Sequence, residues 1–455
     1  MAPSVSRQLR RRPRRGDRFG SWASDPATPL SPFASIAHRW LSVVPKHSAC
    51  LITTGPLSAR PRMFKCATAL VDAGYEVRLV TCPGRGAWSE FDESLAKRRD
   101  WSWDRFPVST PDRIRRRLGR AAMEPMIRAG GWRSPVFAAR AAYPASAALA
   151  RFAAREPADI FLGFGANSLP VAVQAAAARR SLAGFDAEDF HPGEFLNGTH
   201  SASGRARLTL DRHYLPRCGL LTAGSPGIAK AYRECCGVEM TSVLNVFPLE
   251  EAPTEPRPTR TRDKGPLRAY WFSQVVGLDR GLQQFIKAMG VARTPVEFEM
   301  RGSLSAEVRD VLMAVAERAG VARRVRFLPL APPAELVALS QDYDLGLSTE
   351  ISVTGNDEVS LGNKLFAYLL AGVPVLLSST TANREFAPFL GLAARVVEIG
   401  DPGSVAACVD SWASNASTLE EARAQAWRLG RERYNWDAEK SVFLAAIDDA
   451  MRSTR

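Results

Sequence analysis

Short apolar runs and helical patterns alternate along most of the chain. Residues 49–53 are an apolar run, a loop with Pro and Gly follows, and 63–73 repeats at helical spacing before Gly74. A second apolar run, 75–81, comes next, and this order predicts a strand–helix–strand unit with parallel strands. The same rhythm returns at 157–186, at 219–247 and from Leu267 onward. The pattern therefore predicts an α/β protein.

The clearest unit in this pattern spans residues 360–379. Polar helix-start residues come first, apolar residues recur at spacings of three and four, and Gly372 and Pro374 end the helix before the apolar run 375–377. Lys364 falls in the first turn, where the helix dipole disfavours a cation. An anion on the exposed N–H groups, shared with Lys364, accounts for that position. An ordinary α/β unit with a surface lysine is the alternative.

Length and loop composition divide the chain into parts. A chain of 455 residues is too long for one hydrophobic core, so two domains are expected. Residues 250–266 are rich in Pro, Thr and charged residues, as in a linker. Residues 1–45 are rich in Arg, Pro and Ser without a sustained period, and we expect a disordered arm there. The predicted parts are this arm, an N-terminal domain (46–249) with a basic insertion at about 83–155, the linker, and a C-terminal domain (267–455).

Positive charge is concentrated in two segments. The net charge is +13, and residues 1–20 hold seven Arg and one Asp, while residues 97–140 hold twelve Lys or Arg and four acids. The second segment contains Arg113–Arg120, where Ile114 and Leu118 are four residues apart and Trp residues lie nearby. This pattern suits peripheral docking on an anionic membrane, and a solvated helix face is the alternative. Nucleic acid is not expected as a partner, because few aromatic residues accompany the first segment.

The remaining composition favours a cytoplasmic protein. No apolar run approaches the ~20 residues that a membrane-spanning helix needs, and the arginine-rich N-terminus lacks the apolar stretch of a secretory signal. The seven cysteines are scattered without a Cys-x-x-Cys pair, which favours reduced thiols in a cytosol and no zinc site.

Polar residues follow the predicted strands. In open α/β sheets, ligands bind at the carboxyl ends of the strands. This rule places one group of residues at a cleft, namely Gly55, Pro56, Arg60 and Arg62. A later strand leads into four acids within nine residues, namely Asp186, Glu188, Asp189 and Glu194. Because like charges repel, these acids suggest a metal site, a contact to sugar hydroxyls or a base, and helix capping is the alternative.

The sequence Asn-Lys-Leu-Phe-x-Tyr-x-x-Ala-Gly-x-Pro-Val at 363–375 resembles the donor-binding helix of GT-B glycosyltransferases, most closely glycosyltransferase family 4. Further motifs in the family's order extend the resemblance over roughly 48–450, apart from 83–155. These are Ser225-Pro-Gly at a helix start, Arg280-Gly281 after a strand, and Tyr434-Asn-Trp436 at the last helix. The resemblance implies two Rossmann-like domains facing a cleft, with a C-terminal helix that crosses back to the first domain.

The resemblance also assigns roles to residues. Lys364, Arg280 and the helix N-terminus would face the diphosphate of a sugar nucleotide, on which negative charge develops as it leaves. The family's ribose-binding Glu is Ala367 here, and we expect Glu350 to replace it. Where the family often has a His, this chain has Glu188, which could orient sugar hydroxyls or serve as a base. GT-B enzymes usually need no bound metal, so neither a metal nor another cofactor is expected.

The predicted site has three groups of residues. The donor-binding group is Ser273, Gln274, Arg280, Gly281, Glu350, Ser360, Leu361, Gly362, Asn363 and Lys364. The group at the cleft of the N-terminal domain is Gly55, Pro56, Arg60, Arg62, Asn167, Asp189 and Ser225. The catalytic candidates are Glu188, Asp186, Arg280 and Lys364.

These features indicate transfer of a sugar from a nucleotide-sugar donor to a glycan or lipid-linked acceptor. The resemblance implies a retaining hexosyltransferase of polysaccharide biosynthesis, in the cytoplasm or peripheral on the inner membrane face. A sugar-nucleotide epimerase on the same fold is one alternative, with its acid and base in residues 186–194. A catalytically silent GT-B protein that binds a nucleotide or a partner is the other, and Ala367 and Glu188 favour it.

Overall fold

The computed structural model describes residues 47–84, 92, 93, 95, 101–107, 125, 127, 129–257, 265–414 and 416–453. Within these residues, the strands form one sheet of seven strands and one of six. No helix among them is both long and apolar enough to cross a bilayer. The predicted arm at 1–45 and the basic stretch Arg113–Arg120 lie outside the described residues and stay predictions.

The first sheet comes from the N-terminal half of the chain. Its order is β3-β2-β1-β4-β5-β6-β7, and all neighbouring strands are parallel. The strands are β1 (Ser48–Thr53), β2 (Glu76–Thr81), β3 (Ser102–Arg105), β4 (Ile160–Phe164), β5 (Leu182–Ala187), β6 (Leu220–Ala223) and β7 (Thr241–Ser242). The helices of this half are α1 (Pro61–Asp72), α4 (Pro135–Ala142), α5 (Ser146–Ala153), α6 (Leu169–Arg179), α7 (Ala202–Tyr214) and α8 (Pro226–Cys236).

Alternate residues of β1 explain why helices cover both faces of this sheet. Ala49 and Leu51 belong to the same buried cluster as residues of α1, whereas Cys50 and Ile52 belong to a second cluster with residues of α5 and α6. Successive side chains of a strand point to opposite faces. Because both faces of β1 are buried, the strand appears in the sequence as a continuous apolar run.

The second sheet has the order β10-β9-β8-β11-β12-β13, again with parallel neighbours. Its strands are β8 (Leu267–Val275), β9 (Val296–Ser303), β10 (Val325–Leu328), β11 (Leu345–Ser348), β12 (Val375–Ser378) and β13 (Ala394–Val397). Its helices are α9 (Leu282–Val291), α10 (Ala306–Arg318), α11 (Leu336–Ser340), α12 (Gly355–Val359), α13 (Asn363–Leu370), α14 (Thr381–Phe386), α15 (Pro402–Ser414) and α16 (Ala416–Glu432).

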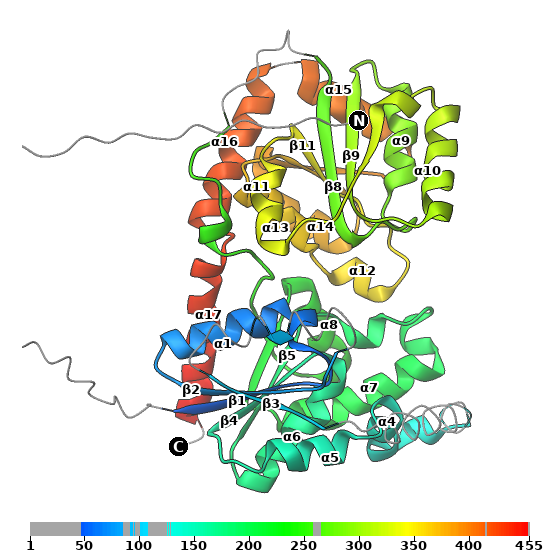
Figure 1. Cartoon of the computed structure of the whole chain (residues 1–455). Coiled ribbons are helices and arrows are strands. Elements are labelled where there is room, and N and C mark those ends of the chain that lie inside the picture. The colour runs from blue at the N-terminus through cyan, green and yellow to red at the C-terminus, as the bar shows by residue number, and fades with distance from the viewer. Residues whose placement is uncertain are drawn as a thin grey trace, which may run out of the picture. The chain divides into compact units, whose positions relative to one another are not determined.

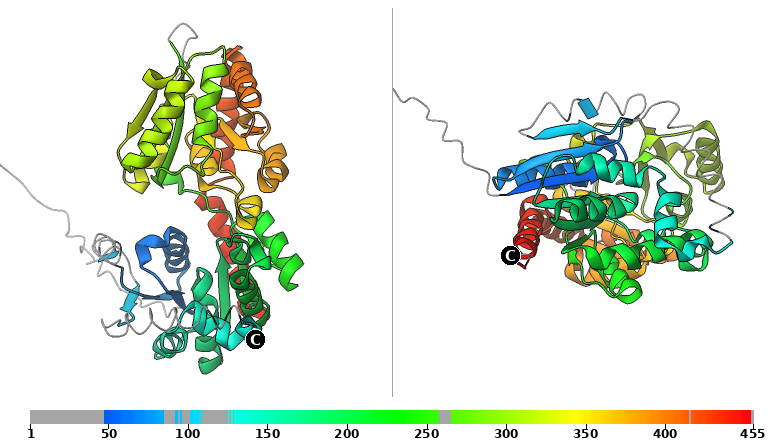
Figure 2. Two further views of the ribbon diagram at one scale, coloured as in Figure 1. Left: turned by 90° about the vertical axis from the view of Figure 1, so that its right-hand side faces the viewer. Right: turned by 90° about the horizontal axis from the view of Figure 1, so that it is seen from below.

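Strand β8 also faces a helical layer on each side. Tyr270 and Phe272 are buried in one cluster with residues of α13, and Ala269 and Trp271 in another with residues of α9 and α10. Figure 1 shows β8 and β9 between α9 and α10 on one side and α11 and α13 on the other, and the left view of Figure 2 shows this half from the side of α9 and α10. The structure therefore confirms the predicted architecture of two parallel, doubly wound α/β units.

The strand orders place a ligand-binding point in each sheet. The order reverses next to the first strand of each sheet, between β1 and β4 and between β8 and β11. In doubly wound sheets, ligands bind outside the carboxyl ends of the strands at this point. Arg280 follows β8 and Glu350 follows β11. The predicted donor residues therefore follow the two strands that this rule selects.

The last helix, α17 (Trp436–Ser453), packs on elements of the first half, where it contacts α1 and β6. The backbone N–H of Trp436 donates to the carbonyl of Phe247 at 2.8 Å. Phe443 and Ile447 are fully buried in the cluster that contains residues of α1, and Figure 1 shows α17 running beside α1. The structure confirms the predicted return of the last helix to the N-terminal half.

Two local predictions about strands are wrong. Residues 83–150 were expected to leave the α/β pattern, yet β3 lies within them and pairs in parallel with β2. Its burial pattern lacks a fully buried position, so no apolar run marks it in the sequence. The strand predicted at 182–186 is confirmed as β5, which includes Asp186 and extends to Ala187. The sequence predicts a strand at 267–272 and a loop from Ser273, but Ser273 and Gln274 belong to β8, where the register with β9 shifts between Phe272 and Val275.

A short helix was also missed before the donor-binding stretch. Helix α12 occupies a Gly-Asn-Asp segment that the sequence suggested as a loop. The Thr354 side chain accepts from the backbone N–H of Asp357, and the Asp357 carboxylate accepts from that of Thr354. This reciprocal pair is a capping box, which fixes a helix start even for Gly and Asn residues with low helix propensity.

Candidate functional site

An ion pair lies at the carboxyl end of β11 and the first turn of α13. Lys364 Nζ donates to Glu350 Oε1 at 2.5 Å, and Ser348 Oγ donates to Glu350 Oε2 at 3.1 Å. The Lys364 and Glu350 side chains are 10% and 22% exposed. Burial alone would raise the pKa of Glu350, but the charge and hydrogen bonds of its neighbours, Lys364 first, lower it below its usual range. The Glu350 carboxylate is therefore ionised at neutral pH.

Lys364 is held at the helix start and is not the surface lysine of the alternative interpretation. Its ammonium also lies 5.5 Å from the centre of the Trp271 ring. No side chain in the described part of the chain caps α13, whose cap position is Gly362. A Cβ on Gly362 would lie 2.8 Å from Ser348 Oγ, so only glycine lets this backbone approach the pair so closely. Ser360 and Leu361 precede Gly362 in this segment, and Asn363 is the first residue of α13.

The loop Asp279–Gly281 packs against the same segment. Thr349 Oγ1 donates to the carbonyl of Arg280 at 3.0 Å, and the N–H of Ile351 donates to that of Asp279 at 3.1 Å. Gly281 has a φ of 73°, and a Cβ there would lie 2.2 Å from the Thr349 carbonyl. The Arg280 guanidinium lies 3.4 Å from the Asp279 carboxylate and is 39% exposed. The structure thus brings Arg280 and Gly281 to the residues around Glu350, while Ser273 and Gln274 end strand β8.

On the first sheet, Arg62 and Asp186 form a buried pair. Arg62 donates to both carboxylate oxygens of Asp186 at 2.8–3.1 Å, and Thr222 Oγ1 donates to Oδ2 at 2.6 Å. Both charged side chains are 1% exposed. The carboxylate outweighs the effect of burial and raises the pKa of Arg62. These two predicted site residues pair with each other below the surface, and Arg62 Nη1 is buried without a hydrogen-bond partner among the described residues.

Glu188 is an acid of this region that remains partly open to solvent. It follows β5 directly, its side chain is 22% exposed, and its Oε2 lies 3.6 Å from an Arg60 nitrogen. Burial raises the pKa of Glu188. The Asp189 charge raises it further, and the Arg62 charge lowers it by less. The Arg60 guanidinium packs against Gly165, because a Cβ on this glycine would lie only 2.6 Å from a guanidinium nitrogen. A carboxyl with a raised pKa beside a guanidinium can accept a proton from a hydroxyl or hold that hydroxyl in place.

The acids of the predicted loop do not cap the next helix. The helix after the loop, α7, is capped by Ser201, whose side chain accepts from the N–H of Gly204. Ligand atoms of Asp189, His191 and Glu194 lie within 4.8 Å of one another, so these three could hold a metal ion. In this structure His191 Nδ1 bonds to Glu194 Oε1 at 2.8 Å, and this bond lowers the pKa of Glu194 against the effect of burial.

Two hydrogen bonds join this region to the segment before α13. Asn356 Oδ1 accepts from the backbone N–H of Phe190 at 2.7 Å, and Asn356 Nδ2 donates to Asp189 Oδ1 at 3.3 Å. Ser225 caps α8 as predicted, and its hydroxyl donates to the carbonyl of Val359 at 2.7 Å. Both contacts involve α12, the helix that sequence analysis missed.

The other predicted cleft residues lie on two turns of the first sheet. Gly55 follows β1, and its carbonyl accepts from the N–H of Cys82 at 3.1 Å. Pro56 precedes a short 3₁₀ helix, and Asn167 lies in another that starts α6. The turns therefore follow β1 and β4, the two strands at the reversal of the strand order.

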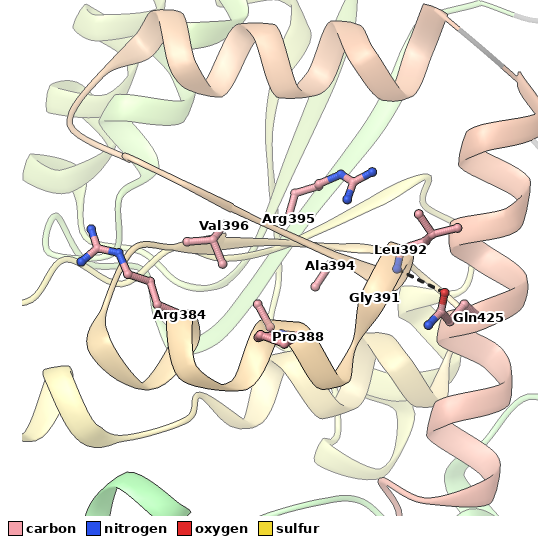
Figure 3. A pocket seen from close by; sticks show the side chains of 9 residues that line it. Arg384, Pro388, Gly391, Leu392, Ala394, Arg395, Val396 and Gln425 are labelled. Carbon is pink, nitrogen blue, oxygen red and sulfur yellow. Dashed lines mark hydrogen bonds between the residues drawn. The ribbon is translucent and has the colours of Figure 1, made fainter.

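A separate pocket lies beside β13 (Figure 3), with a volume of about 630 Å³. Gln425 of α16 accepts from the N–H of Leu392 at 3.1 Å on one side of it. Its lining residues are Arg384, Ala387, Pro388, Gly391, Leu392, Ala394, Arg395, Val396 and Gln425. None of the residues predicted from the sequence lines this pocket.

No protein-family model and no curated protein matches the sequence. Solved structures match over most of the chain. HepE from Anabaena, in complex with UDP and glucose, has a TM-score of 0.65 at 15% identity, over 89% of this chain and 100% of HepE. Sucrose-phosphate synthase from Thermosynechococcus elongatus has a TM-score of 0.63 at 12% identity, over 90% of this chain and 100% of its own. The chain has a GT-B fold.

A third solved structure matches in the same way. A glycosyltransferase from Rickettsia africae has a TM-score of 0.63 at 9% identity, over 90% of this chain and 99% of its own. The predicted GT-B fold is confirmed, while the closer resemblance to family 4 stays a prediction. At these identities the matches concern the fold, so the activity has to be argued from the site.

Proposed function

We propose that the protein is a glycosyltransferase that moves a sugar from a nucleotide-sugar donor to an acceptor hydroxyl. The observation that carries this proposal is the Lys364–Glu350 pair at the uncapped start of α13, beside the Arg280–Gly281 loop. A lysine ammonium, an arginine guanidinium and free backbone N–H groups are the donors that a diphosphate requires. Glu350 lies next to them as an acceptor for hydroxyl groups.

The transfer depends on charge that develops as the bond between sugar and diphosphate breaks. Lys364, Arg280 and the N-terminus of α13 would stabilise the negative charge on the leaving diphosphate, which is the main requirement of such a reaction. Glu350 would take the ribose hydroxyls, the role that Ala367 cannot fill. Glu350 holds Lys364 in place before a donor binds. Lys364 would therefore need little rearrangement to contact the diphosphate of the donor.

On the acceptor side, we propose that Glu188 orients the hydroxyl that attacks the sugar. The proposed outcome is retention of the anomeric configuration, supported by the resemblance to family 4. A finding of inversion would instead assign Glu188 the role of general base. We propose no bound metal, a glycan or lipid-linked acceptor, and a cytoplasmic site of action with peripheral contact to an anionic membrane.

The neighbours suggest which donors to test first. HepE was solved with UDP and with UDP-glucose, and a trehalose-phosphate synthase from Burkholderia xenovorans with glucose-6-phosphate. We therefore propose a uridine-based donor. Binding of UDP has to be compared with binding of GDP and ADP to test this. Donor turnover without an acceptor and with a changed sugar would identify the epimerase alternative.

The first prediction concerns donor binding. UDP or another nucleoside diphosphate is expected to raise the melting temperature of the protein, since a ligand that binds the folded state stabilises it by mass action. Lys364→Ala should abolish the shift, and Lys287→Ala, which removes an exposed lysine from α9, should preserve it. Thermal melts with UDP, GDP, ADP and their common sugars make the measurement. A shift that survives in Lys364→Ala would contradict the site.

The stereochemical outcome is measured separately. NMR of the anomeric proton of the product would decide between retention and inversion.

A further inference from the structure

Two residues that sequence analysis did not select connect helix α1 to Glu188. Lys65 Nζ donates to Asn245 Oδ1 at 3.1 Å, and Asn245 Nδ2 donates to Glu188 Oε1 at 3.2 Å. Lys65 Nζ also donates to the carbonyl of Val246 at 2.5 Å and lies 5.3 Å from the centre of the Trp436 ring. The three side chains thus form one hydrogen-bonded row that ends at a catalytic candidate.

The direction of these hydrogen bonds is fixed by chemistry. An ammonium has donors only, so the Asn245 oxygen has to face Lys65 and the Asn245 NH₂ group has to face Glu188. Burial lowers the pKa of Lys65 to about 8, which still leaves it mostly protonated at neutral pH. The amide consequently offers Glu188 a donor of fixed orientation, and such a donor favours the ionised carboxylate.

The row is anchored by the first turns of the last helix. Glu439 Oε2 accepts from the backbone N–H of Leu244 at 2.7 Å, and Asp437 Oδ2 accepts from that of Leu249 at 3.1 Å. These contacts flank Asn245 on both sides in the sequence. Helix α17 therefore fixes the backbone from which Asn245 reaches Glu188.

We propose that Asn245, oriented by Lys65, is a positioning residue that holds Glu188 in the rotamer and charge state with which it meets the acceptor hydroxyl. This proposal rests on the proposed glycosyl transfer. The remaining contact of Glu188 to a cation, at 3.6 Å from Arg60, is longer than a hydrogen bond and does not fix a rotamer. The charged groups that act on Glu188 are Asp189, Arg62, Asp186, Arg60 and Lys65.

The test uses the full chain and two variants of Asn245. Asn245→Leu removes both hydrogen bonds, and Asn245→Asp keeps a partner for Lys65 but places a second carboxylate against Glu188. Both are expected to lower kcat for transfer about 10- to 100-fold, the range for losing a hydrogen bond to a charged group. The melting shift with nucleotide should be unchanged. Asn435→Ala, which removes an amide that bonds only α16 and α17 backbone, is the control for a purely structural loss.

A second readout is independent of activity. In protein labelled with ¹³C at the glutamate carboxyl, the resonance missing in Glu188→Gln identifies Glu188, and its pKa is followed by titration. Asn245→Leu should raise this pKa by about one pH unit, since one unit corresponds to 1.36 kcal/mol of lost interaction. An unchanged Glu188 pKa in both variants overturns the inference. A wild-type protein that transfers no sugar overturns the proposed function instead, and the titration would still show whether Asn245 controls Glu188.

Discussion

Two acids at the end of one strand have opposite environments. Asp186 accepts three hydrogen bonds from Arg62 and Thr222 shorter than 3.1 Å, while Glu188, two residues later, is 22% exposed beside Arg60. A carboxylate that is saturated by partners of the same protein has no oxygen left for a substrate. Asp186 therefore stabilises the fold, while Glu188 keeps accessible surface for the role proposed for it.

This contrast predicts different effects of two isosteric changes. Asp186→Asn leaves the buried Arg62 charge without its counter-ion and is expected to lower the free energy of unfolding by about 3–5 kcal/mol. Glu188→Gln should change that free energy by less than about 1 kcal/mol, as is usual for a partly exposed residue, but should abolish transfer. Urea denaturation and a transfer assay measure the two effects. Equal stability losses in both variants would refute the distinction.

The sequence could not reveal which of these acids was buried. Their spacing and the rule of strand ends were enough to select both, but the partner of Asp186 is 124 positions away in the chain. Lys65 and Asn245 are 180 positions apart, and neither belongs to a recognisable motif. Asn245 does follow a short strand, β7, so the same rule of strand ends could have singled it out. Lys65 carries no comparable signal.

At the scale of elements, close backbone approach at glycines shapes the donor region. Gly281 has a φ of 73° and faces the Thr349 carbonyl, and Gly362 faces Ser348. Gly281 was selected by resemblance to a family and Gly362 as a helix-start residue, and the structure supplies the physical reason for both. A side chain at either position would push the loop that carries Arg280, or the start of α13, away from Glu350.

Gly281→Ala is expected to weaken nucleotide binding about tenfold. A non-glycine residue at positive φ costs about 1–2 kcal/mol, and 1.4 kcal/mol is a factor of ten in affinity. The loop relaxes in the free variant, and the ligand has to restore its geometry. Gly400→Ala is the matched control, because nothing lies within 4 Å of its Cβ position. Isothermal titration with the nucleotide found by thermal shift would check this, and equal affinities for both variants would contradict it.

Helices and strands were predicted correctly where glycine and proline mark their ends, whereas strand β3 and helix α12 were missed. Helix α13 ends before Gly372, which has a φ of 69°, and β12 begins after Pro374, as glycine and proline chemistry requires. Strand β3 lies at the edge of its sheet and has no fully buried residue. It therefore needs no apolar run, and its sequence is Ser-Trp-Asp-Arg. Helix α12 had a capping-box signal, Thr354 with Asp357, that was overlooked.

At the scale of the whole molecule, stability should depend on pH through Glu251. Burial, opposed by Lys65, raises the pKa of Glu251 to about 7. A carboxyl whose pKa is higher in the folded state contributes stability that is present below its unfolded value near 4.5 and is lost as pH rises through 7. As the pH rises from about 5 to 7, the wild type should therefore lose free energy of unfolding that the Glu251→Gln variant does not lose.

Urea denaturation of both proteins at several pH values measures this difference. Glu250→Gln, which changes the exposed neighbour, should keep the pH dependence of the wild type. If Glu251→Gln also kept that dependence, Glu251 would ionise in the folded protein as it does in the unfolded chain.

The position of α17 has a consequence for synthesis. Phe443 and Ile447 belong to the same buried core as α1, although some 370 positions separate them in the sequence. A ribosome releases the chain from the N-terminus, so the face of the first sheet that α17 covers stays open until translation is almost finished. The first half therefore cannot complete its core before α17 is made. A premature stop upstream of Trp436 removes Phe443 and Ile447 from that core.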